Sequence, residues 1–167
     1  MTEHRIRADD FEDVAAARAV EEGLDPVTFR AMFGIFRLSG RMFNDLEARV
    51  HRPAGWSLAG FRVMFLLWVL GPMESFEIAR LVGLSRAAIS SAVNTLERDG
   101  LVDRRRESVD GRVVTVHLTD DGSARLETAY RAQNVREREL FGDLTDDELV
   151  TLTDLMRRIS ANRVDDD

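Results

Sequence analysis

Residues 75–100 decide the fold, and they read SFEIARLVGLSRAAISSAVNTLERDG. Apolar side chains recur at three- and four-residue spacing in two short segments, which predicts amphipathic helices at residues 76–82 and 86–98. Ser75 and Ser85 precede these segments, where a hydroxyl oxygen can accept a hydrogen bond from a free N–H of the first turn. The stretch therefore predicts two consecutive short helices that begin at serine caps.

A further set of positions indicates how these two helices cross. A helix-turn-helix needs a small residue at the crossing, a glycine at the turn and an apolar residue that anchors the second helix. Ala79, Gly83 and Ile89 supply the three in this order, four and six residues apart. The pattern therefore predicts a helix-turn-helix rather than two independent helices.

The segment that follows has the pattern of a β-hairpin. Two strand-like runs, residues 101–106 and 113–118, are joined by residues 107–112, which contain Asp110-Gly111. An Asp-Gly pair between two such runs is a strong signal for a tight turn. We therefore expect a winged helix-turn-helix: a mainly α chain (α+β) with a small β-hairpin wing and helices before and after it.

The helix before this lobe is expected to pair with another helix. Asp25-Pro26 starts it, because Asp caps a helix and proline is preset for the first helical position; Pro53 and Gly55 end it. A seam at seven-residue spacing is formed by Phe29, Phe36, Phe43 and Val50. Such a seam suits packing between two subunits, and core packing within one subunit is the alternative.

The remaining segments complete the division of the chain. Helices are expected at residues 9–22, at 58–70 after the cap Ser57, at 120–140 after the cap Thr119, and from the capping box Thr145/Glu148 onward. We expect an acidic N-terminal arm or short helix (1–24), a dimerisation helix (25–55), a winged helix-turn-helix lobe (56–119) and C-terminal dimerisation helices (120–167).

Charge and composition narrow the function. The chain carries a formal charge of −7 and has no cysteine, and all 23 basic residues are arginine. Disulfides, thiol nucleophiles and lysine Schiff bases are therefore excluded. Residues 113–167 carry −6, whereas residues 80–112 carry +2. The acidic total argues weakly against nucleic-acid binding, but the arginines gather where the second short helix and the wing would meet DNA phosphates.

The residue types on the second short helix suit base recognition. Arginine can bind guanine, asparagine can bind adenine, serine can bind either base or a phosphate, and an alanine methyl can contact thymine. Arg104 and Arg106 share one strand face, Arg112 at the hairpin tip suits a minor groove, and Asp110 can orient it. The expected DNA-binding residues are Ser85, Arg86, Ala87, Ser90, Ser91, Asn94, Arg98, Arg104, Arg106, Asp110 and Arg112.

Three motifs resemble the MarR family of transcriptional regulators. They are Leu96-Glu-Arg-Asp-Gly-Leu-Val-Asp-Arg104, Asp110-Gly-Arg112 and Val116-His-Leu-Thr-Asp-Asp-Gly122. The resemblance extends over about residues 25–163. It implies a homodimer held by the N- and C-terminal helices, with two winged lobes on a palindromic operator, and it favours a repressor. A winged helix used for protein–protein contact, without specific DNA binding, is the alternative.

The resemblance also implies release from DNA when a small aromatic or anionic compound binds between the dimer helices and the winged lobe. The residues near that place that suit such a ligand are Arg41, His51, Trp56 and Arg62. Phe65 and Trp68 are interpreted as core residues.

Other function classes find little support in the sequence. Its three histidines are far apart, and it contains no nucleophile elbow, zinc-protease motif or glycine-rich phosphate loop. We therefore expect no enzyme activity, no catalytic or metal-binding residues and no cofactor. A metal-sensing member, with a site assembled from glutamate and histidine across helices, is the alternative. The longest apolar run is too short to span a bilayer, and the N-terminus lacks a secretory pattern. We expect a cytoplasmic protein with no membrane partner.

Overall fold

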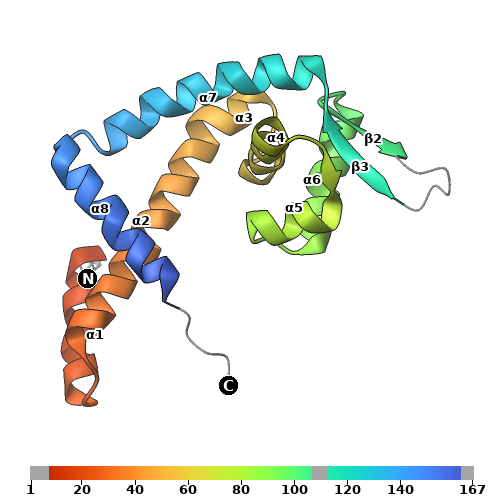
Figure 1. Cartoon of the computed structure of the whole chain (residues 1–167). Helices are drawn as coiled ribbons and strands as arrows, with labels where there is room; N and C mark the ends of the chain where they lie inside the picture. Colours follow the sequence, from red (N-terminus) through yellow and green to blue (C-terminus); the bar gives the residue numbers. More distant parts are fainter. Residues whose placement is uncertain (1–7, 107–112, 163–167) are drawn as a thin grey trace, which may run out of the picture.

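The computed structural model describes residues 8–106 and 113–162. In chain order the elements are α1 (Ala8–Glu21), α2 (Pro26–Leu46), a π-helical turn (Glu47–His51), α3 (Arg52–Ala54), α4 (Leu58–Leu70), β1 (Met73–Glu74), α5 (Ser75–Val82), α6 (Arg86–Arg98), β2 (Val102–Arg106), β3 (Val114–Leu118), α7 (Asp120–Leu140) and α8 (Asp146–Ala161). Figure 1 shows α4–α6 and the sheet under one end of the long helix α7, with α1, α2 and α8 toward its other end. The mainly helical fold with a small β wing is as predicted.

The predicted helix caps explain most of the boundaries. Four cap side chains accept hydrogen bonds from backbone N–H groups of the first turn: Asp25 (from Val27 and Thr28), Ser57 (from Gly60), Ser85 (from Ala88) and Thr119 (from Gly122). Thr145 and Glu148 form the predicted capping box of α8. The prediction for α5 was wrong by one residue, because Glu74 rather than Ser75 is the N-cap and forms a capping box with Glu77.

The sheet has one strand more than the predicted hairpin. Its order is β1-β3-β2, and both pairings are antiparallel. The extra strand, Met73–Glu74, is only two residues long, so no alternating pattern could mark it in the sequence. It pairs with Val116 and Thr115 and thereby ties the start of α5 to the wing.

The predicted single helix over residues 25–55 contains an unpredicted change of backbone geometry. After α2, residues Glu47–His51 form the π-helical turn, and α3 continues to Gly55. The neighbours Val50 and His51 are both buried there. Earlier in the heptad seam the side chains are open, since Phe36 is 68% exposed and Phe43 is 43% exposed.

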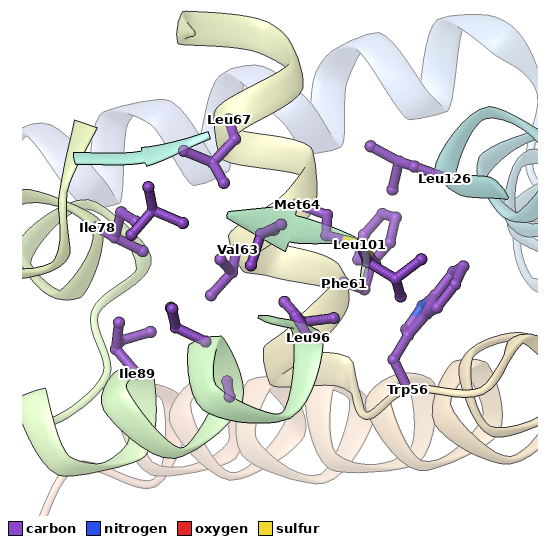
Figure 2. Close-up of a cluster of buried hydrophobic side chains, with 14 of the residues drawn as sticks. Trp56, Phe61, Val63, Met64, Leu67, Ile78, Ile89, Leu96, Leu101 and Leu126 are labelled. Atoms are coloured by element: carbon purple, nitrogen blue, oxygen red, sulfur yellow. The ribbon is translucent and has the colours of Figure 1, made fainter. Parts of the chain in front are cut away.

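The core lies in the lobe. Side chains from α4, α5, α6, β2, β3 and α7 meet in one cluster, which includes Val63, Met64, Ile78, Ile89, Leu96, Leu101, Val116 and Leu126. In Figure 2 the labelled side chains surround α4, with Ile78 on one side, Leu126 on the other, and Ile89 and Leu96 below. Ile78 and Ile89 are fully buried, so the two helices of the helix-turn-helix are held against α4 by their apolar faces.

A close backbone contact joins the wing to α7. The Thr119 hydroxyl donates to the carbonyl oxygens of Gly100 and Leu101, at 2.8 and 3.1 Å. A Cβ atom on Gly122 would lie 2.1 Å from the Leu101 carbonyl oxygen. Glycine is therefore needed where α7 begins, because any side chain would displace the backbone below it.

Among the described residues no single helix is long and apolar enough to cross a membrane. Residues Pro26–Ala54 and Leu58–Leu70 meet the length and composition criteria together, but they are bent by 75°.

Candidate nucleic-acid interface

The helix-turn-helix has the predicted internal geometry. The Ala79 carbonyl oxygen accepts hydrogen bonds from the N–H groups of Gly83 and Leu84, at 3.0 and 3.3 Å. Gly83 adopts φ +71°, a left-handed conformation that glycine reaches without strain. Ile89 is completely buried and anchors α6. The small residue, the turn glycine and the apolar anchor thus have the roles expected from their spacing.

Helix α6 presents a polar face on the side away from its buried face. Ile89, Ala92, Val93 and Leu96 point into the core. The exposed side is a shallow hollow of about 630 Å³ lined by Ala87, Ser90, Ser91, Asn94, Thr95 and Arg98. Five of these six were expected DNA-binding residues, and Arg86 beside them is also exposed. The structure therefore brings the expected helix residues together on one accessible surface.

The strand arginines do not all face the same way. Arg104 lies directly opposite the buried Val116, and Arg106 lies opposite Val114. Directly paired residues share one face of a sheet, so Arg104 lies on the face that covers α6. Its guanidinium donates to Asn94 Oδ1 at 2.7 Å and forms an ion pair with Glu97. Sequence analysis missed these contacts, because the seven- and ten-residue separations leave no local signal.

The other wing arginines are more open. Arg105 lies on the opposite face and donates to the Asp103 carboxylate at 2.8 Å, while Arg106 is exposed. Arg98, at the end of α6, pairs with Asp99 at 3.1 Å but stays 73% exposed. A pair so open to solvent contributes little stability, so the arginine can exchange it for another anion. Asp110 and Arg112 lie outside the described residues.

The four expected ligand residues lie in different surroundings. Arg41 is exposed on α2. Arg62 on α4 lies over the Phe43 ring, 4.8 Å from its centroid. Trp56 is buried, and Arg125 of α7 lies 5.4 Å from its ring centroid. His51 is fully buried and stacks on Phe61 at 4.4 Å.

Burial sets the charge state of His51. Both of its ring nitrogens are buried without a hydrogen-bond partner among the described residues. Burial lowers the pKa of His51 below its usual value, and the nearby Glu47 carboxylate opposes this only in part. His51 is therefore a neutral core residue at pH 7 in this conformation.

Sequence analysis missed an aromatic cluster that involves α7. Tyr130 of α7 lies 5.0 Å from the ring of Phe65 and 6.2 Å from the ring of Trp68. Phe65 is half-buried, in line with its interpretation as a core residue, whereas Trp68 is 43% exposed. Trp68 is thus the edge of the cluster rather than part of the core.

A salt bridge joins α7 to α2. Arg136 of α7 binds both carboxylate oxygens of Asp45 in α2, at 2.6 and 2.8 Å, and also contacts Glu139. The Arg136 guanidinium holds the pKa of the Asp45 carboxyl below its usual value. Because the two residues are 91 positions apart, no local sequence pattern could predict this link between α2 and α7.

Taken together, α4–α6 and the three-stranded sheet form a winged helix-turn-helix, whose second helix exposes polar groups suited to a DNA groove. These features define a protein of the winged-helix class. The family follows from comparison with known proteins. A sequence profile of the MarR family matches residues 56–114. The uncharacterized HTH-type transcriptional regulator YwaE of Bacillus subtilis (strain 168) is 32% identical over 128 residues, which cover 77% of this chain and 75% of that protein. The chain belongs to the MarR family.

A second relative and a solved structure are also similar to the chain. The HTH-type transcriptional repressor YetL of B. subtilis (strain 168) is 26% identical over 144 residues, with 83% of this chain and 86% of that protein covered. A mutant of E. coli MarR complexed with operator DNA has the same fold, with a TM-score of 0.67 at 24% identity, over 75% of this chain and 89% of that one. The chain is a transcriptional regulator with a DNA-binding fold, not an enzyme.

Proposed function

We propose that the protein is a homodimeric repressor that binds a palindromic operator and is released from it by a small aromatic or anionic ligand. Each lobe would place α6 in a major groove and its wing against the neighbouring backbone. Repression is supported by the name of YetL, and operator binding by the E. coli MarR complex. The cytoplasmic location stays a prediction.

The observation that carries DNA binding is the exposed face of α6. Serine, asparagine and arginine side chains are held there by a rigid lobe, and exposed arginines flank them on α6 and β2. Phosphate contacts by arginine supply affinity, and groove contacts by the other groups supply sequence preference.

Dimerisation is supported by apolar surface that the described chain leaves uncovered. Helix α8 buries none of its residues, although it carries an apolar stripe that includes Leu155, Met156 and Ile159. The seam on α2 is also open at Phe36 and Phe43. A contiguous apolar surface of this kind marks an interface, and a second copy provides a matching one.

A binding titration tests the DNA proposal. We expect the protein to bind the DNA upstream of its own gene more tightly than random DNA, with an affinity that falls steeply with salt. Arg86→Ala and Arg112→Ala should each cost about 1–3 kcal/mol of operator affinity. Arg131→Ala, an exposed arginine of α7, is the matched control and should have no effect. Equal binding to upstream and random DNA at low salt would contradict the proposal and favour a protein-binding winged helix.

The ligand proposal rests on the aromatic cluster of Phe65, Trp68 and Tyr130 and on the guanidinium of Arg62, which belongs to the same helix as Phe65 and Trp68. Aromatic rings and one cation suit an aromatic carboxylate. Benzoate should therefore raise the melting temperature and weaken DNA binding, whereas cyclohexanecarboxylate, with the same charge but no aromatic ring, should do so less. The shift should be lost in Trp68→Leu. Identical responses to both acids would contradict recognition by the aromatic cluster.

A further inference from the structure

The guanidinium of Arg104 lies between two side chains of the DNA-facing helix. It donates to Asn94 Oδ1 from Nη2 at 2.7 Å, and Nη1 pairs with the Glu97 carboxylate. The Arg104 side chain is 28% exposed, much less than that of Arg105 at 58%. Arg104 is therefore already engaged with α6 in the absence of DNA.

This contact fixes which way the Asn94 amide faces. A guanidinium has only N–H donors and no acceptor. The Asn94 atom that faces Arg104 must then be the carbonyl oxygen, and the NH₂ group is the part left for DNA. The assignment follows from the chemistry of the partner rather than from the positions of the two amide atoms alone.

An engaged carbonyl oxygen changes what Asn94 can recognise. Asparagine binds adenine by accepting from the N6 amino group and donating to N7. In this protein the Asn94 carbonyl oxygen already accepts a hydrogen bond from Arg104. The adenine amino group would have to donate to the same oxygen, which would place it beside the positively charged guanidinium. Guanine presents two acceptors, O6 and N7, and no donor on the same edge. It therefore matches the NH₂ donor that Asn94 is left to present.

We propose that Arg104 is a positioning residue that makes Asn94 a donor-only reader, so that each operator half-site carries a guanine rather than an adenine opposite Asn94. The proposal rests on the DNA binding proposed above. Glu97 has a part in it, because its carboxylate holds the guanidinium against α6 and offsets its charge.

Selection from random-sequence duplexes with the full-length protein, followed by anisotropy titrations of the selected site, tests the proposal. Wild type should select guanine at one position in each half-site, and Asn94→Ala should lose the preference at that position alone. Arg104→Gln should shift the guanine-to-adenine affinity ratio there toward adenine by about fivefold, the lower end of what a bidentate base contact discriminates. Arg104→Lys keeps a cationic donor and should retain guanine.

Arg105→Gln is the matched control on the same strand. Because Arg105 lies on the strand face away from α6 and pairs with Asp103, its loss should leave the base preference unchanged. A uniform loss in Arg104→Gln with unchanged preference would show that Arg104 is only a phosphate anchor, and selection of adenine by wild type would also overturn the inference. Both results leave the proposed function standing, whereas failure of wild type to enrich any sequence would overturn the two together.

Discussion

The winged lobe and the helices around it differ in how far they bury their apolar side chains. In the lobe, Val63, Ile78, Ile89 and Val116 are completely buried within one chain. In α1, α2 and α8, apolar side chains such as Val14, Phe36 and Ile159 are more than half exposed. The lobe therefore has a closed core, whereas the outer helices leave apolar side chains exposed. The stability of the lobe should not depend on protein concentration, whereas the stability of the outer helices should rise with protein concentration.

The largest effect is expected from a cavity in the lobe. Leu96 is 1% exposed and packs in the centre of the cluster, so Leu96→Ala should lower the free energy of unfolding by about 2–5 kcal/mol. Urea denaturation measures the loss, and light scattering under native conditions should show an unchanged oligomeric state. A loss below 0.5 kcal/mol, on the order of a surface substitution, would contradict a closed core in this lobe.

A somewhat smaller effect is expected where the lobe meets α7. Gly122→Ala forces a Cβ atom against the Leu101 carbonyl, and overpacking of this kind costs about 1–3 kcal/mol. The matched control is Gly40→Ala in α2, where a Cβ atom meets nothing within 4 Å; alanine should be tolerated there. Thermal unfolding of the two variants compares them directly. Equal melting temperatures would mean that the junction is not tightly packed.

The interface region should respond through assembly rather than through folding. Ile159→Glu places a charge on the exposed apolar stripe of α8 and should raise the dimer dissociation constant at least tenfold, about 1.4 kcal/mol. Ala161→Glu adds the same charge two residues further along, on the opposite side of the helix, and should leave the dimer intact. Size exclusion with light scattering distinguishes a particle of 18.9 kDa from one of twice that mass. A wild-type protein that is monomeric at all concentrations would contradict the proposal that the outer helices form a dimer interface.

The smallest effect is expected from His51, at the boundary of the two regions. Because burial lowers its pKa, the unfolded chain takes up a proton below about pH 6.5 while the folded chain does not. Stability should therefore fall as the pH drops from 6.5 toward the lowered pKa. His51→Phe keeps a ring against Phe61 and should flatten this fall between pH 7 and 5.5. Equal slopes in wild type and variant, measured by urea denaturation, would exclude His51 as the source.

The local features of the fold could be predicted from the sequence. The N-caps Asp25, Ser57 and Thr119 are short-range signals, because each cap bonds an N–H group two or three residues away. The helix-turn-helix was predictable for the same reason, since Ala79, Gly83 and Ile89 stand within eleven residues. The exposed polar face of α6 was predictable from the helical period, which separates buried from exposed positions.

The features that sequence analysis missed depend on contacts between distant residues. Strand β1 exists only because β3 lies beside it. The contact of Arg104 with Asn94 depends on how the sheet covers α6, and the Asp45–Arg136 pair joins residues 91 positions apart. His51 was expected near a ligand because of its chemistry, but the π-helical turn places it in the core.

The rigid start of α7 has a consequence for operator geometry. Thr119 and Gly122 fasten the wing to a helix of 21 residues, which is about 31 Å long. In the proposed dimer the C-terminal end of this helix lies at the α8 interface and its N-terminal end lies near the DNA, so that a change of angle at the first end displaces the second. A tilt of about 10° at the interface moves the wing by about 5 Å over that length. In that dimer the angle between the two copies of α7 would set the distance between the two copies of α6, and thus the spacing of half-sites that fits.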